Sequence, residues 1–81
     1  MFLQIISPSK IVFEGEILSV KVPGEEGEFE MLNKHAAIVS SLNKGTIRVI
    51  KEDKSKDEIK IKSGVVEMQK NKIILLIEES E

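Results

Sequence analysis

Alternating β-branched aliphatic residues are the feature that most restricts the folds open to this chain. Ile and Val supply 19 of the 81 residues, whereas Ala supplies two. Two heavy atoms on Cβ restrict χ1 in a helix but suit the pleated surface of a strand. In residues 46–49 and 59–62, aliphatic and polar side chains alternate with period two, which is typical of a half-buried strand. We therefore expect a protein built from strands.

Turn-forming residues divide the chain into short extended segments. Pro8 disfavours the helical region at the preceding residue, and Gly45 is expected to adopt positive φ in a turn. The expected breaks are 14–15, 23–24, 43–45, 52–57, 63–64 and 70–71. The expected strands are 2–7, 10–13, 16–22, 29–32, 46–51, 59–62, 65–69 and 72–77.

Two of these segments also predict which side chains are buried. From Glu16 the alternation puts Leu18, Val20 and Val22 on one face, so we expect these three side chains in the core. Residues 72–77 are apolar on both faces, which indicates a central place in a sheet or a face covered by a partner.

Residues 36–43 allow either a helix or a strand. Ile38 and Leu42 are spaced for one helical face, and Gly45 would serve as a C-cap. Val39 and two serines favour a strand instead. Short strands separated by frequent turns predict an all-β sandwich or barrel, organised as one domain over residues 1–81.

Composition excludes several classes of function. The chain has no Cys and one His, so it lacks disulfides, Cys-based metal clusters and the common multi-His sites. Twelve basic and 14 acidic residues, with three scattered Phe, do not resemble a nucleic-acid-binding surface. The longest apolar run, Ile73–Ile77, is far below the roughly 20 residues of a membrane helix, and no signal peptide is apparent. We expect a soluble, intracellular protein whose contact with membranes is indirect.

The chain carries no recognisable catalytic motif. His35 lies near Ser40 and Ser41 in sequence, but no oxyanion-hole motif or nucleophile elbow accompanies it. The segment 24–27 is not a phosphate loop, because its carboxylates would repel phosphate. A solvated acidic turn explains the carboxylates better than a calcium loop, whose spacing they do not match. These carboxylates are Glu25, Glu26, Glu28 and Glu30. We expect no catalytic residue, cofactor or metal.

Between Phe13 and Leu42 the chain carries, in order, a Phe-x-Gly, a hydrophobic strand, a Gly-x-x-Gly-Glu-hydrophobic segment and a His-Ala pair. The matching residues are Phe13, Gly15, Val20, Val22, Gly24, Glu26, Gly27, Glu28, Phe29, His35 and Ala36. This ordered combination resembles the N-terminal domain of the epsilon subunit of the rotary F-type ATP synthase. The similarity continues through 43–48 and 63–67 to the closing strand, so it covers almost the whole chain.

The resemblance implies both a fold and a role. It implies a small, flattened antiparallel β-sandwich without long helices, in which residues 36–42 form a strand. The implied role is that of a non-catalytic central-stalk (rotor) subunit. Such a subunit links the gamma subunit to the membrane c ring and couples proton translocation to ATP synthesis.

The resemblance also implies contact residues. Glu28 matches a position that faces the polar loops of the c ring, and Glu26 is its neighbour. Ser7 and His35 match positions that lie toward the gamma subunit. The implied location is peripheral, at the cytoplasmic face of the bacterial inner membrane, with membrane contact only through the c ring. No cofactor and no nucleic acid is implied.

Three features depart from the family pattern. Glu30 occupies a position usually given to Gly, and 33–37 replaces the usual Pro-Gly-His-Ala-Pro, which removes backbone restrictions from this loop. Family members commonly continue beyond the position of Glu81 into a helical hairpin that inhibits ATP hydrolysis and in some members binds ATP. The resemblance covers the β-sandwich without that hairpin.

Two other functions stay open on the sequence alone. The first is a free-standing β-sandwich adaptor that binds a protein or peptide, because a scaffold does not fix its function. The second is a metal-assisted hydrolase built on the acidic loop, which the calcium-loop mismatch disfavours.

Overall fold

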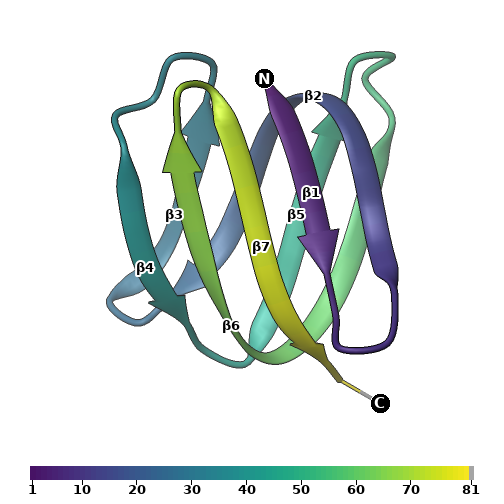
Figure 1. Ribbon diagram of the computed structural model, residues 1–81, viewed down its shortest axis with the longest axis vertical. Helices are drawn as coiled ribbons and strands as arrows, with labels where there is room; N and C mark the ends of the chain where they lie inside the picture. The colour runs from purple at the N-terminus through teal and green to yellow at the C-terminus, as the bar shows by residue number, and fades with distance from the viewer. Residues whose placement is uncertain (81) are drawn as a thin grey trace.

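The computed structural model describes residues 1–80 and contains strands but no helix in that range (Figure 1). Residues 38–42, for which the sequence allowed a helix, form a strand. The seven strands are β1 (Phe2–Ile6), β2 (Ile11–Gly24), β3 (Gly27–Leu32), β4 (Ile38–Leu42), β5 (Gly45–Lys51), β6 (Lys56–Gln69) and β7 (Lys72–Glu79).

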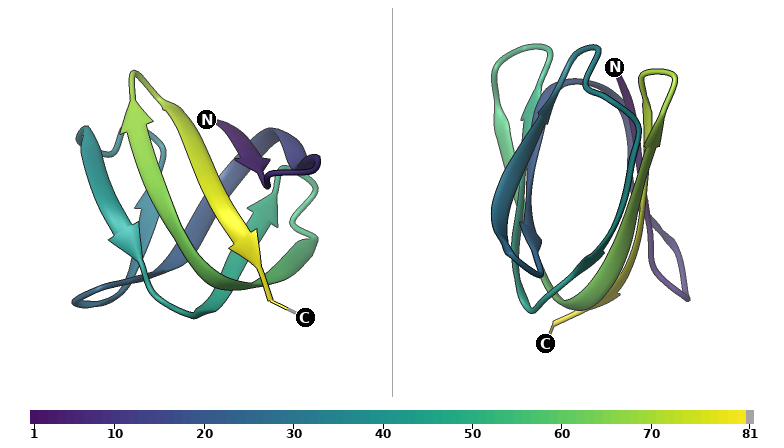
Figure 2. Two further views of the ribbon diagram at one scale, coloured as in Figure 1. Left: turned by 60° about the horizontal axis from the view of Figure 1, so that its bottom comes forward. Right: turned by 90° about the vertical axis from the view of Figure 1, so that its left-hand side faces the viewer.

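One continuous sheet folds over itself into two layers. Its strand order is β1-β7-β6-β4-β2-β3, and β5 pairs with both β2 and β6. Figure 2, right, shows the layers edge-on, with β4, β6 and β7 on one side and β3 and β5 on the other. The sandwich expected from the sequence is confirmed. Its pairings are antiparallel except for β1 with β7, which run parallel.

The two longest strands belong to both layers. The first half of β2 pairs with β1 and its second half with β3 and β5, while β6 pairs first with β5 and then with β4 and β7. Each strand has a register shift near its middle, between Ile17 and Ser19 in β2 and between Ile61 and Ser63 in β6. A bulge bends a strand and increases its twist, which lets each strand turn the corner between layers.

Three expectations about these two strands are wrong. Strand breaks were expected at 14–15 and 63–64, yet both β2 and β6 run through these residues. The predicted alternation also fails at the start of the bulge in β2, where Ile17 faces the core (3% exposed) and Leu18 faces outward (44% exposed). One extra residue shifts every following side chain to the opposite face. Leu18 was therefore wrongly expected in the core, whereas Val20 and Val22 are buried as predicted.

Two turns show different uses of backbone conformation. Lys70 and Asn71, which connect β6 and β7, both have positive φ (52° and 63°), as a two-residue type I′ hairpin requires. Gly45 was expected to have positive φ, and this is wrong. It is required for close approach instead, since an added Cβ would lie 2.7 Å from the Pro23 Cβ.

The core lies between the two layers and consists almost entirely of Ile, Leu, Val and Met side chains. The inward residues of β7 (Ile73, Leu75 and Ile77) are buried, while Leu76 points outward and is 53% exposed. β7 lies between β1 and β6, which confirms the central place predicted for this segment. The other members of the core are Leu3, Ile5, Ile17, Val20, Val22, Met31, Leu42, Ile47, Val49, Ile61, Val66 and Met68.

Candidate interaction surfaces

The outer face of the layer formed by β1, β7, β6 and β4 carries a row of apolar side chains. Val65 on β6 pairs with Leu76 on β7, Leu76 with Ile6 on β1, and Ile6 with Ile11 on β2. Cross-strand partners point to the same side of a sheet. Ile11, Val65 and Leu76 are 55%, 42% and 53% exposed, and Ile6 is half-buried. We call these four residues the apolar band.

The outer face of the other layer is charged. Four residues there form a cross-strand row, in the order Glu30, Lys21, Arg48 and Glu58. The Arg48 guanidinium bridges two carboxylates, with Nε 2.9 Å from a Glu58 oxygen and Nη1 3.2 Å from a Glu28 oxygen. The two faces therefore differ chemically, since one carries the apolar band and the other carries a row of matched charges.

The acidic hairpin, defined as Glu25, Glu26 and Glu28, joins β2 to β3. Gly24 pairs with Gly27, so Glu25 and Glu26 form a two-residue turn. Gly27 has φ 121°, a value that residues other than glycine rarely adopt. All three carboxylates are exposed, and only Glu28 has an ion-pair partner among residues 1–80. The two residues predicted to face a c ring, Glu26 and Glu28, are thus brought together.

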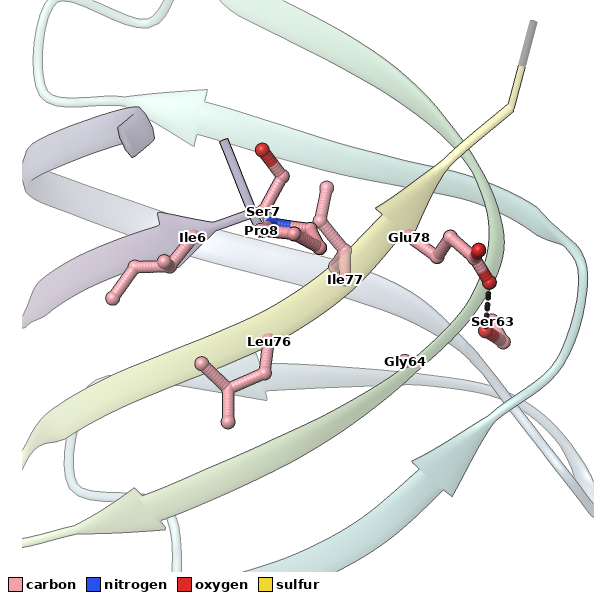
Figure 3. Close-up of a pocket in the computed structure, with 8 residues that line it drawn as sticks. All are labelled: Ile6, Ser7, Pro8, Ser63, Gly64, Leu76, Ile77 and Glu78. Carbon is pink, nitrogen blue, oxygen red and sulfur yellow. Dashed lines mark hydrogen bonds between the residues drawn. The ribbon is translucent and has the colours of Figure 1, made fainter. Parts of the chain in front are cut away.

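Ser7 lies at a hollow of roughly 450 Å³ at the end of β1 (Figure 3). Its side chain is mostly buried, and both its amide and its hydroxyl donate to the Lys10 carbonyl (2.9 and 3.3 Å). Apolar atoms form most of the lining, which includes two members of the apolar band, Ile6 and Leu76. Glu78 and Ser63 stand at one side, where the serine hydroxyl donates to the carboxylate (3.5 Å).

His35 lies in the loop between β3 and β4 and is exposed. Its amide donates to the Leu32 carbonyl (3.0 Å), and its Nδ1 donates to the Ala36 carbonyl (2.8 Å). The loop is fixed by Asn71 of the β6–β7 turn. Asn71 Oδ1 accepts from the Lys34 amide (2.8 Å), and its Nδ2 donates to Asn33 Oδ1 (2.6 Å).

The structure does not bring the two predicted gamma-contact residues together. Ser7 follows Ile6, which pairs with Leu76 near the end of β7, whereas the His35 loop is held at Asn71, before β7 begins. Ser7 instead shares one end of the sandwich with the acidic hairpin, because Gly24, Leu42, Gly64 and Ile77 follow one another across the paired strands. Any partner that contacts both Ser7 and His35 must span the length of β7.

Sequence reasoning missed the apolar band and the role of Arg48. One indication of the band was present in the sequence, because residues 72–77 are apolar on both faces. That pattern does not reveal which neighbouring strands supply the other residues of the band. Arg48 on β5 contacts Glu28 on β3 across the intervening strand β2, and the two residues are 20 positions apart. No local pattern encodes such a pairing.

A family described as "ATP synthase, Delta/Epsilon chain, beta-sandwich domain" matches residues 1–81. The chain belongs to this family. Relatives named ATP synthase epsilon chain include that of Sulfurimonas denitrificans, which is 45% identical over 94% of this chain and 58% of the relative. Those of Chlorobium limicola and Chlorobaculum tepidum are 40% and 43% identical over 95% of this chain and 88% of each relative. This family member therefore spans little more than half the length of some relatives and most of others.

Solved structures agree with the fold. A chain of the Euglena gracilis mitochondrial ATP synthase (OSCP/F1/c-ring) superposes with a TM-score of 0.89 at 22% identity, covering 95% of this chain and 49% of that one. A chain of the Tetrahymena thermophila mitochondrial ATP synthase (central stalk and c ring) gives a TM-score of 0.79 at 15% identity, covering 96% and 63%. At these identities the likeness establishes the β-sandwich.

Two further chemical features of residues 1–80 bear on the candidate surfaces. No three His, Asp or Glu side chains are grouped as metal ligands in this part of the chain. Within the same range, no helix has the length and apolarity needed to cross a membrane.

Proposed function

We propose that this domain is a non-catalytic central-stalk subunit of an F-type ATP synthase, linking a gamma subunit to a membrane c ring. In that role it couples proton translocation to ATP synthesis without performing bond chemistry itself. Family membership supports the proposal, together with relatives named ATP synthase epsilon chain. The named relatives are bacterial, so we place the domain at the cytoplasmic face of the inner membrane, in contact with lipid only through the ring.

The apolar band is the observation that carries the gamma-binding part. Burial of apolar surface is the dominant favourable contribution to most protein association, and a contiguous exposed apolar patch marks an interaction site more often than scattered residues do. Ser7 lines the hollow beside Ile6 and Leu76, so a subunit seated on the band would reach it. His35 would contact the same partner at the other end of β7.

The acidic hairpin supports ring docking through Glu26 and Glu28. Carboxylates on a rigid turn suit basic loops, because charge-assisted hydrogen bonds fix register without a large apolar area. Isolated exposed ion pairs contribute only about 0–1 kcal/mol each. The hairpin would therefore act with other contacts rather than alone.

Mixing the chain with a purified bacterial gamma subunit, followed by size-exclusion chromatography, tests the proposal. We expect a stable one-to-one complex. Leu76→Ser should weaken it by about tenfold or more, because a leucine side chain loses its burial in the interface. Leu32→Ser is the matched control, since Leu32 is also 53% exposed but lies on β3 in the other layer.

A complex that tolerates Leu76→Ser and is lost with Leu32→Ser would place gamma on the wrong face and contradict the use of the apolar band. The absence of any complex with gamma would contradict the stalk role itself. It would favour a free-standing adaptor.

A further inference from the structure

Strand β4 has one paired edge and one open edge. Along its length it pairs with β6, from Ile38 opposite Met68 to Leu42 opposite Gly64. On its other side the only strand pairing within residues 1–80 is that of Leu42 with Gly24. Figure 1 shows β4 at the left margin of its layer, with the β2–β3 hairpin beside its lower end.

The direction of the open amides follows from one hydrogen bond. The Asn43 amide donates to the Pro23 carbonyl (2.8 Å), on the side of β4 away from β6. The N–H and C=O of one residue point to the same side of a strand, and successive residues alternate between the two sides. The backbone groups of Ser41 and Val39 therefore face the open side. The Ser41 carbonyl also accepts from the Ser40 hydroxyl (3.2 Å). Backbone groups without a strand partner at such an edge are a template for another strand.

Nothing in the chemistry of β4 protects this edge. Residues 36–43 contain no charged residue and no Pro, although charges, Pro and bulges are the usual means of blocking an exposed edge. By contrast, β3, which lies at one end of the sheet order, carries two carboxylates, Glu28 and Glu30. Val39 is the most exposed large apolar residue of the protein among those described, at 70%.

A groove of roughly 530 Å³ lies between β4 and the acidic hairpin. One wall is residues 38–41 of β4, and the other is residues 24–29, which include all three carboxylates of the acidic hairpin. Phe29 and Ile38 are half-buried there and supply apolar surface. Glu25 and Glu26 have no ion-pair partner among residues 1–80, so their charge is available to an occupant.

We propose that the open edge of β4 accepts an extended, basic segment of a partner protein as an added strand. Main-chain hydrogen bonds to Val39 and Ser41 would supply affinity, and Lys or Arg side chains facing Glu25 and Glu26 would supply specificity. This site is separate from the proposed gamma surface, although its groove includes both residues of the proposed ring contact, Glu26 and Glu28.

A synthetic ten-residue peptide of alternating Lys and β-branched residues is the probe, and two-dimensional NMR of the 81-residue chain is the readout. We expect shift changes and slowed amide exchange at Val39 and Ser41. A peptide with Glu in place of Lys should bind about tenfold more weakly, because it meets like charges. A Lys peptide N-methylated at alternate residues should not bind, since it cannot form the added ladder.

Val39→Pro removes one donor on the open side and leaves the β6 side unchanged, so it should reduce binding by about tenfold or more. Val39→Thr keeps the amide and should bind normally. If Val39→Pro does not fold, the N-methylated peptide makes the same test with the unaltered protein. Equal binding of Lys and N-methylated peptides, shifts centred on Leu76, or self-association through β4 without peptide would each overturn the proposal. Neither gamma nor a c ring is present, so these results leave the proposed function untouched.

Discussion

Glu28 is the residue at which an internal ion pair would compete with the proposed contact to a c ring. Its carboxylate lies 3.2 Å from Arg48, which also holds Glu58 at 2.9 Å. Both carboxylates are at least half exposed, so each pair contributes little to folding. Arg48 restricts where the Glu28 carboxylate points, and a basic loop of a partner would have to share or replace this contact.

Reversing the charge at Glu28 separates these roles. We expect Glu28→Lys to weaken docking to a purified c ring by about tenfold while changing the free energy of unfolding by less than about 0.5 kcal/mol. Glu58→Lys breaks the other Arg48 pair and is the matched control, expected to leave docking intact. Co-sedimentation with ring-containing vesicles measures the first quantity and urea unfolding the second. Equal effects of both variants would exclude a direct ring contact at Glu28.

Asp53 offers a residue-scale prediction on pH. The pKa of its carboxyl is held below the usual value, mainly by the Ser55 hydroxyl (2.5 Å) and also by the Ser55 amide (2.9 Å). A carboxyl with a lowered folded-state pKa stabilises the fold above its unfolded pKa, and this contribution disappears as pH falls through the folded value. Ser55→Ala should raise the pKa of Asp53, which an NMR titration of the side-chain carboxyl carbon measures. An unchanged midpoint would show that the hydroxyl is not the cause.

At the scale of elements, the β6–β7 turn holds the loop that carries His35 in place through two hydrogen bonds, which we call the Asn71 clip. Asn71 makes two side-chain hydrogen bonds to that loop, at Lys34 and Asn33. The same residue needs positive φ within the hairpin. One residue therefore serves both the turn and the neighbouring loop.

Asn71→Gly isolates the clip, because Gly adopts positive φ readily and removes only the amide side chain. We expect a loss of about 0.5–2 kcal/mol in the free energy of unfolding, together with faster hydrogen exchange at the Lys34 amide. Lys70→Gly, at the adjacent turn position, is the control and should leave Lys34 exchange unchanged. Unaltered protection of Lys34 in Asn71→Gly would show that the loop is ordered by other contacts.

The elements also show how far the sequence alone predicts this fold. Alternation and turn residues predicted six of the seven strands and left residues 36–43, which contain β4, open between helix and strand. They also divided β2 and β6 at Gly15 and Ser63-Gly64, where the structure continues. At Ser63-Gly64 the reason is that a bend between layers and a break between strands both favour small residues. Gly64 is needed because an added Cβ would lie 2.8 Å from the Leu76 carbonyl oxygen, a contact with β7 that no local pattern reveals.

The candidate surfaces were predicted to different degrees. The acidic hairpin is contiguous in sequence, so Glu26 and Glu28 were placed together from the motif alone. Their role, like those of Ser7 and His35, stays a prediction. The apolar band and the open edge of β4 depend on which strands become neighbours. For example, β1 pairs with β7, although these strands lie near opposite ends of the chain. Pairings at such sequence separation are not readable from periodicity.

At the scale of the whole molecule, one shared core supports both layers. The adjacent residues Leu75 and Leu76 lie on opposite faces of β7, one fully buried and the other 53% exposed. Leu75→Ala should therefore lower the free energy of unfolding by about 2–5 kcal/mol. Leu76→Ala should lower it by less than about 1 kcal/mol. Urea unfolding followed by circular dichroism measures both, and similar losses would contradict the assignment of the faces.

The bulged strands β2 and β6 have a mechanical consequence. Because each passes from one layer into the other, a torque applied to either face is carried across by covalent backbone as well as by contacts between side chains. Two separate sheets could slide over each other, because the apolar side-chain contacts between them are not directional. Here such sliding would have to break the backbone hydrogen bonds on both sides of the bends in β2 and β6. The sandwich therefore resists shear between its layers.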